Sequence, residues 1–477
     1  MSILRYKNEF QKIILILSSL LFFIVNYLYS EFDTLNTGGF QWLTELYFFD
    51  TFILLGVDSI SVCFLLLVTL IIPLCLLFNW YTTNNLEEQK LFFSILLLLE
   101  LLLILVFIVL DLLAFYVIFE FILIPFYIIV VLYKVRHYVR NNKSENRKMH
   151  AFFLLFFYTI FGSLIMLLGI IIIYLNTGTT MIPLLWYIPF DGFLEYFLWV
   201  LFFISFSIKI PILPLHLWLP EAHVESPTEG SVVLASILLK IGAYGIIRIL
   251  IPFFYNATIY FSILLWLLCI LSVIYTSMSA SIQIDIKRVI AYASVGHMNI
   301  GILGLVSMEI HSITGSLILM IAHGLASGGL FFSIGILYNR FHTKHFKYYN
   351  GIVQLMPLFS VFFFIFIVSN FSLPGTLSFI GEFLIFKSFF IKQIYFIHVC
   401  IFFSILLSSF YSIILYNKIL FANSNSVLLY KVKDINIFEF SILLPLVILI
   451  IYLGFSPAIL IDLLLSDLNY YFIYLIS

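Results

Sequence analysis

Four strongly charged side chains lie inside long apolar stretches of this sequence. They are Glu120 in FYVIFEFILIP, Lys209 and Lys240 at the two ends of KIPILPLHLWLPEAHVESPTEGSVVLASILLK, and Glu382 in FIGEFLIF. Burial disfavours the charged form of a carboxyl or amino group, and a nearby opposite charge favours it. Such a group can therefore take up and release a proton when its partner or its hydration changes, which is the chemistry of proton translocation.

Two histidines, His297 in SVGHMNIG and His323 in IAHGLASGG, are equally central in apolar stretches and could relay protons between these groups. A simpler alternative is that they form hydrogen bonds between helices, and that a buried Lys–Glu pair only holds helices together. A lone charge at the bilayer centre costs ~3 kcal/mol, so four charges kept only for packing would be costly. Other acidic residues are expected to be solvated at helix ends or in turns: Glu100, Asp111, Glu221, Glu225 and Glu229.

The composition identifies the environment of these residues. The chain has 477 residues, of which 63% are hydrophobic and 10% charged, with a formal net charge of -1. A soluble domain carries ~25% charged residues, so a soluble globular protein is excluded. Apolar runs of membrane-spanning length recur along the chain without the alternation of barrel strands, which predicts an all-α polytopic membrane protein. The near-zero net charge indicates no nucleic-acid partner, and the four scattered cysteines form no metal or iron–sulfur pattern.

The hydrophobic pattern predicts a single membrane domain over residues 1–477, with about 13–14 transmembrane helices. Thirteen spans are expected near residues 11–29, 52–78, 91–110, 112–133, 151–175, 193–218, 228–250, 259–280, 289–308, 313–338, 352–390, 394–417 and 437–460. With this count, only Arg248 and Lys392 of the 23 basic residues lie on the side opposite the N-terminus, and Lys209, Lys240 and Lys387 lie inside spans. So strong an asymmetry predicts that the basic side faces the matrix or cytoplasm.

Two of the spans are too long for one crossing and too short for two, and both contain proline. Pro211 and Pro214 interrupt the first, and Pro374 with Gly375 interrupts the second. Proline removes a backbone donor and breaks the helix, which is tolerated in a membrane only inside protein or beside water. Because the breaks fall five spans apart, they predict two inverted five-helix repeats, residues 91–250 and 259–420, each with a broken helix at a transport site.

Several stretches resemble the antiporter-like, proton-pumping subunits of respiratory complex I. They are FYVIFEFILIPFYII, KIPILPLHLWLPEAHVESPTEGSVVLASILLKIGAYGIIR, DIKRVIAYASVGHMNIGILG, MIAHGLASGGLFF and NFSLPGTLSFIGEFLIF, with LGVDSISVCFLLLVTLIIPLC near the N-terminus. The resemblance covers about residues 55–460. It implies fourteen helices, one more than the thirteen spans, and we expect the additional helix near the N-terminus.

The resemblance also implies roles for the buried residues. Glu120 and Lys209 would form the first pair, Lys240 the central relay and Glu382 the exit group, with His297 and His323 on the path between them. The energy would come from NADH–quinone redox chemistry in other subunits, which would hold the NADH, FMN, iron–sulfur and quinone sites. This chain would carry no cofactor and no metal, and its partners would be other complex I membrane subunits and phospholipids. The resemblance assigns no role to Lys387.

Three alternatives stay open at this stage. The same motifs occur in cation/proton antiporter subunits of the Mrp type, which would depend on sodium. A haem-bearing cytochrome would need paired histidines on facing helices, and His297 and His323 lie on neighbouring spans. A structural spacer subunit would tolerate neutral substitution of the buried charges.

Overall fold

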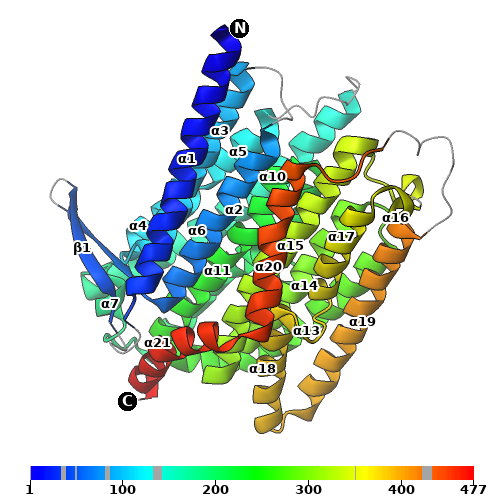
Figure 1. Cartoon of the computed structure of the whole chain (residues 1–477). Helices are drawn as coiled ribbons and strands as arrows, with labels where there is room; N and C mark the ends of the chain where they lie inside the picture. The colour runs from blue at the N-terminus through cyan, green and yellow to red at the C-terminus, as the bar shows by residue number, and fades with distance from the viewer. Residues whose placement is uncertain are drawn as a thin grey trace.

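The computed structural model describes residues 2–33, 39–48, 51–80, 86–132, 142–349, 351–421 and 432–476, and it is an α-helical bundle with one β-hairpin (Figure 1). Twelve described segments are long and apolar enough to cross a membrane, and a thirteenth crossing is the broken helix α17–α18. The all-α polytopic fold expected from the sequence is therefore confirmed. The N-terminus and the C-terminal ends of α15 and α19 lie at one end of the bundle, called here the basic end (Figure 1).

The helices of the first part of the chain are α1 (Ser2–Glu31), α2 (Ser59–Asn79), α3 (Leu86–Ile108), α4 (Leu112–Phe121), α5 (Leu123–Leu132), α6 (Asn142–Thr177), α7 (Ile182–Leu185), α8 (Gly192–Lys209), α9 (Trp218–Glu225), α10 (Thr228–Val233), α11 (Leu239–Gly245) and α12 (Ile251–Phe253). Two π-helical turns, η1 (Leu234–Leu238) and η2 (Ile246–Leu250), join α10 through α12 into one crossing. The later helices are α13 (Tyr255–Ile282), α14 (Ile286–Val306), α15 (Ile310–Phe341), the 3₁₀ turn η3 (Phe346–Tyr348), α16 (Ile352–Leu355), α17 (Pro357–Asn370), α18 (Leu377–Ile391), α19 (Tyr395–Leu420), α20 (Ile437–Phe455) and α21 (Ala458–Ile476).

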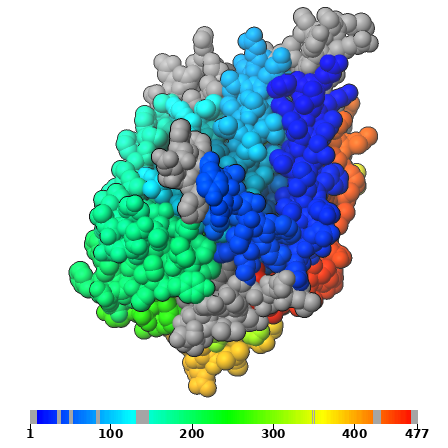
Figure 2. All heavy atoms as spheres, turned by 90° about the vertical axis from the view of Figure 1, so that its left-hand side faces the viewer, coloured from blue at the N-terminus to red at the C-terminus, as the bar shows by residue number. Residues whose placement is uncertain are grey.

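Two predictions about the ends of the bundle were wrong. The span expected at 52–78 begins only at Ser59, because Gln41–Phe48 and Thr51–Val57 pair as the antiparallel strands β1 and β2. Leu110 N–H donates to Leu54 O and anchors this hairpin to the bundle, beside α1 and α6 on the face that Figure 2 shows. The helix beyond the thirteen spans is the C-terminal α21, which lies across the end opposite the basic end, and not a helix near the N-terminus (Figure 1).

The broken helices lie where proline predicts them. α8 ends at Lys209, residues 210–217 are irregular around Pro211 and Pro214, and α9 resumes at Trp218. The second break separates α17 from α18, with Gly375 at a φ of +97°, a conformation that glycine adopts without strain. The span predicted at 112–133 is also interrupted, at Ile122, because Pro125 has no N–H to donate to the carbonyl of Phe121.

The order of elements parallels the two predicted repeats. In residues 91–250 and in 259–420 the broken helix is the fourth of five crossings: α8–α9 in the first, and α17–α18 in the second. The inverted symmetry itself stays a prediction.

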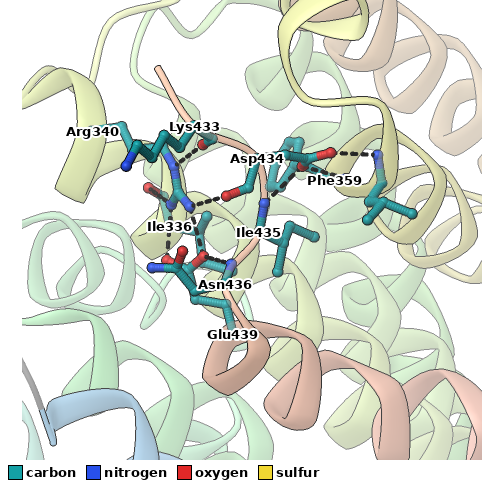
Figure 3. A network of polar contacts seen from close by, with 9 residues as sticks. Ile336, Arg340, Phe359, Lys433, Asp434, Ile435, Asn436 and Glu439 are labelled. Atoms are coloured by element: carbon teal, nitrogen blue, oxygen red, sulfur yellow. Dashed lines mark hydrogen bonds and ion pairs between the residues drawn. The ribbon is translucent and has the colours of Figure 1, made fainter. Parts of the chain in front are cut away.

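A polar clamp at the basic end joins α15, α17 and α20 (Figure 3). Arg340 donates to both carboxylate oxygens of Glu439, at 2.8 and 2.6 Å, and to the carbonyl oxygens of Lys433 and Asp434. The Asp434 carboxylate accepts hydrogen bonds from the first free N–H groups of α17, those of Leu358 and Phe359. Paired Arg–carboxylate bonds fix orientation as well as distance, so the clamp aligns the first half of the broken helix with α15.

Glycines let α18 approach α15 closely enough to bring Glu382 near the centre of the bundle. A Cβ atom on Gly381 would lie 2.7 Å from Leu319 N and 2.8 Å from Gly315 O, and both are backbone atoms. Small residues of this kind permit close helix contact in membranes, where lipid provides no hydrophobic drive for association. The position of Glu382, the next residue, therefore depends on Gly381.

We predict that Gly381→Ala separates α15 from α18 and destabilises the folded chain by about 1–3 kcal/mol, because backbone atoms cannot move aside for the added methyl group. Thermal stability of the purified assembly and its abundance on native gels measure this effect. Gly192→Ala is the matched control, since nothing lies within 4 Å of the position of its Cβ. Equal stability of the two variants would contradict the assigned packing.

Candidate functional site

Lys240 is the centre of the site and is fully buried in α11. Its ammonium group donates to Ala235 O and lies 2.9 Å from His323 Nδ1 of α15. The π turn η1 makes the first of these contacts possible, because Leu239 N–H bonds Leu234 O, five residues back, and not Ala235 O. Single π turns inside α-helices are frequent at functional sites. Lys240 therefore has both of its partners inside the protein.

A row of contacts continues from Lys240 to Glu382 through the two histidines. The ring centroids of His323 and His297 are 5.8 Å apart, and His297 Nδ1 lies 3.3 Å from Glu382 Oε1. All four side chains are buried, and they come from α11, α15, α14 and α18. The structure thus brings together four of the six residues predicted from the sequence, and we call Lys240, His323, His297 and Glu382 the central row.

A small cavity adjoins His297 of the central row. It has a volume of about 10 Å³ and lies between α13, α14 and α19. Hydroxyl groups supply much of the remaining wall: Thr276, Ser277, Tyr292, Ser404, Ser408 and Tyr411. Tyr411 also lies within electrostatic range of Glu382. The cavity is about large enough for a single water molecule next to His297.

Glu120 and Lys209 face each other less closely than the members of the central row. The two charges are near enough to interact electrostatically, but the hydrogen bonds and ion pairs of the described residues include none between them. The Lys209 ammonium lies over the ring of Phe119, 4.0 Å from its centroid. Glu120 is half-buried just before the interruption of its helix at Ile122. The first pair is thus held loosely beside two helix breaks.

Sequence reasoning missed a polar cluster between the basic end and the central row. The Lys287 ammonium donates to Ser226 O at 3.0 Å and to Ser231 Oγ at 3.3 Å. His223 is fully buried, stacks on Phe331 and interacts electrostatically with both Lys287 and Lys240. The sequence did not predict the burial of His223, because HVESPTEG has the composition of a surface turn.

Several solvation expectations were wrong for the same reason. Glu229 and Glu100 are buried, because the packed helices cover positions that hydropathy placed at ends or turns. Lys387, by contrast, is exposed on α18 and has no ion pair among those of the described residues. It therefore does not pair with Glu382, which contacts His297.

Comparison with known proteins places this arrangement in a family. The family described as NADH:quinone oxidoreductase/Mrp antiporter, TM, matches residues 109–408. The chain is 43% identical to NADH-ubiquinone oxidoreductase chain 4 of Chondrus crispus, over 92% of this chain and 88% of that protein. It is also 43% identical to chain 4 of Acanthamoeba castellanii, over 82% of this chain and 76% of that protein. The chain belongs to the NADH-ubiquinone oxidoreductase chain 4 family.

Solved structures agree with membership in the chain 4 family. A chain of respiratory complex I from Thermus thermophilus with bound NADH superposes with a TM-score of 0.86 at 28% identity, covering 97% of this chain and 94% of that one. A chain of the Mrp complex from Dietzia sp. has the same fold, with a TM-score of 0.85 at 16% identity over 100% of this chain and 96% of that one. The resemblance to complex I antiporter-like subunits is confirmed, and the roles of individual site residues stay predictions.

We predict that Glu382→Gln in this chain 4 relative removes the negative charge beside His297 while keeping its shape, so the assembly forms but pumps fewer protons per NADH oxidised. The matched control is Lys387→Gln, which neutralises an exposed charge on the same helix. Acidification of proteoliposomes during NADH oxidation measures both variants. Normal pumping in Glu382→Gln would exclude Glu382 from the path.

Proposed function

We propose that this chain is a proton-translocating membrane subunit of an NADH:ubiquinone oxidoreductase, respiratory complex I. The observation that carries the proposal is the central row, in which Lys240, His323, His297 and Glu382 follow one another through the bundle. A fully buried amine in contact with an imidazole, a second imidazole and a carboxylate is arranged for proton exchange rather than for a bond-making reaction. Membership in the chain 4 family supports the same function.

The proposed mechanism follows from the contacts of each group. Lys209 and Glu120 form the first pair. Their approach favours the charged form of Lys209, and their separation, as in the loose arrangement described above, favours passage of the proton to Lys240. Lys240 then gives its proton to His323, from which it moves through His297, beside the small cavity, to Glu382. His297 Nε2 and His323 Nε2 are both buried without a hydrogen-bond partner in the described structure. The step between the rings therefore requires a bridging water or rotation of an imidazole.

The proposal includes the surroundings of the chain. It lies in the mitochondrial inner membrane with its basic end toward the matrix, or in the plasma membrane if the source is bacterial. Its partners are other membrane subunits of complex I and phospholipids, and it has no nucleic-acid partner. NADH, FMN, iron–sulfur clusters and quinone belong to partner subunits, which supply the redox energy. The multi-subunit complexes that contain the solved relatives support this assembly.

The second candidate function is that of an Mrp-type cation/proton antiporter subunit, favoured by the fold shared with the Mrp complex of Dietzia sp.. The two functions differ in their energy source. A complex I subunit acidifies vesicles when NADH is oxidised, with or without sodium, whereas an antiporter subunit exchanges protons for sodium without NADH.

We predict that Lys240→Met slows NADH-driven proton pumping by about tenfold or more, because a positioned proton carrier contributes ~10²–10⁴-fold to a transfer step. Glu120→Gln should also assemble and pump less, and Glu120→Asp should retain part of the activity. Lys12→Met, an exposed residue of α1, is the control. Pumping is measured in proteoliposomes with a pH-sensitive dye and compared with and without an uncoupler. Unchanged pumping in Lys240→Met and Glu120→Gln would favour a spacer role.

We predict that the loop between α13 and α14, residues 283–285, faces the matrix. Residues 134–141 of the predicted basic loop at 134–150 lie outside the described residues and the rest belong to α6, so the α13–α14 loop is the better target. Ile284→Cys should react with a membrane-impermeant maleimide only from the matrix side, and Asp191→Cys, in the exposed loop at the opposite end, only from the other side. The reversed pattern in sealed vesicles of known orientation would overturn the proposed orientation.

A further inference from the structure

A second buried charge cluster lies at the end opposite the basic end, away from the central row. Arg248 of η2 forms an ion pair with Asp58, the N-cap residue of α2, at 2.6 Å. Asp467 of α21 accepts a hydrogen bond from Ser59 N–H at 2.7 Å. All three charged side chains are at most 3% exposed. The cluster therefore joins α21 to the end of the crossing that carries Lys240.

The two carboxyl groups of the cluster have different partners, because Arg248 pairs with Asp58 and, among the ion pairs of the described residues, not with Asp467. Arg248 contacts Asp58 directly and donates through Nε to Tyr244 OH, so its charge is directed toward Asp58. Asp467 has a backbone N–H as its hydrogen-bond donor and lies within range of the Asp58 charge. The hydroxyl of Ser59, in the same buried place, has no hydrogen-bond partner in the described structure. Two carboxylates beside one guanidinium would leave a net buried negative charge, which is costly.

The pKa values of the two carboxyl groups shift in opposite directions. Burial disfavours the Asp58 carboxylate, but Arg248 beside it outweighs burial and holds the pKa of Asp58 below its ordinary value. Burial, together with the Asp58 charge, raises the pKa of Asp467. Of the two carboxyl groups, Asp467 is therefore the one that binds a proton more readily.

We propose that the attachment of α21 to the bundle depends on a proton held by Asp467, so that loss of this proton loosens α21. When Asp467 loses its proton to water, its carboxylate is left buried beside ionised Asp58 with one shared cation, and repulsion disfavours the closed contact. This device goes beyond the proposed function, because it includes no member of the central row. It would make the end of the Lys240 crossing sensitive to the proton concentration on its own side.

Other titratable groups lie near the cluster, and the test must distinguish their titration from that of Asp467. Cys63 of α2 lies within electrostatic range of both carboxyl groups, and Tyr244 of α11 is hydrogen-bonded to Arg248. Asp462 lies on the exposed face of α21. Unperturbed thiols and phenols titrate near ~8.5 and ~10, so Cys63→Ser and Tyr244→Phe are useful companions.

The direction of the pH effect follows from the raised pKa of Asp467. A group whose pKa is higher in the folded state stabilises that state fully below its unfolded pKa, and this contribution is lost as pH rises through the folded pKa. Protection of α21 amides should therefore be highest at low pH. Between the unfolded and the folded pKa it should fall by up to about tenfold per pH unit, the slope for one proton, and it should level off above the folded pKa.

The test is hydrogen–deuterium exchange of residues 458–468 in the purified assembly between pH 5 and 9, corrected for the intrinsic pH dependence of exchange. The unmodified protein should lose protection with rising pH, and Asp467→Asn, which resembles the protonated acid, should stay protected throughout. Asp467→Glu, Cys63→Ser, Tyr244→Phe and the matched control Asp462→Asn should keep the transition. A flat profile in the unmodified protein, or the same transition in Asp467→Asn, would overturn the proposal. A transition lost in Asp58→Asn but kept in Asp467→Asn would also overturn it.

Discussion

The amine of Lys240, fully buried inside the bundle, is the constraint on which the rest of the architecture depends. A charged or neutral amine in hydrocarbon requires partners, and the two that it has come from different structural devices. The π turn η1 frees the carbonyl of Ala235, and the unbroken helix α15 presents His323. Both partners must be held rigidly. Accordingly, an 18-residue apolar stretch of the crossing that carries Lys240 is entirely buried, and so is an 18-residue stretch of α15.

The broken helices solve a second problem, which is how to place polar groups inside an apolar bundle. Lys209 is the last residue of α8, where the partial negative charge of a helix C-terminus favours a cation by ~0.3–1 kcal/mol. Glu382 lies in the second turn of α18, on the side of that helix's positive N-terminal end. The first interruption therefore supplies backbone charge of the sign that Lys209 requires. Glu382 lies beyond the first turn of α18, where this effect has largely fallen off.

The sequence predicted the composition of the site well and its connectivity poorly. Charges within apolar runs and prolines within spans are local signals, so Glu120, Lys209, Lys240 and Glu382 and both breaks could be read directly. Which side chains touch depends on the rotation of each helix about its axis, and packing between distant segments sets this rotation. The contact between Lys240 and His323 joins residues 83 positions apart, and no local pattern reports it.

Other features escaped prediction for physical reasons of the same kind. The hairpin at 41–57 lacks strict alternation, because β2 is covered by the bundle, and its apolar residues read as the start of the next span. The helix α21 contains Asp462 and Asp467 and lies across the bundle, so hydropathy does not distinguish it from a tail. Asp467 becomes a structural residue only because Asp58 and Arg248, from two other segments, meet it.

The contacts from Lys240 to Glu382 are closer than those between Glu120 and Lys209. This difference indicates where conformational change acts. From Lys240 onward the central row is in contact or nearly so, whereas Lys209 stacks on Phe119 and makes no direct contact with Glu120 in the described structure. On the side of Lys240 the surroundings of Lys209 are tightly packed, since a Cβ on Gly242 would lie 3.1 Å from Lys209 Cβ and 2.6 Å from Ile210. A proton therefore cannot pass from Lys209 to Lys240 through this contact without movement or hydration. The irregular segment 210–217 has backbone groups freed by Pro211 and Pro214, which makes the first break a natural gate for the proposed path.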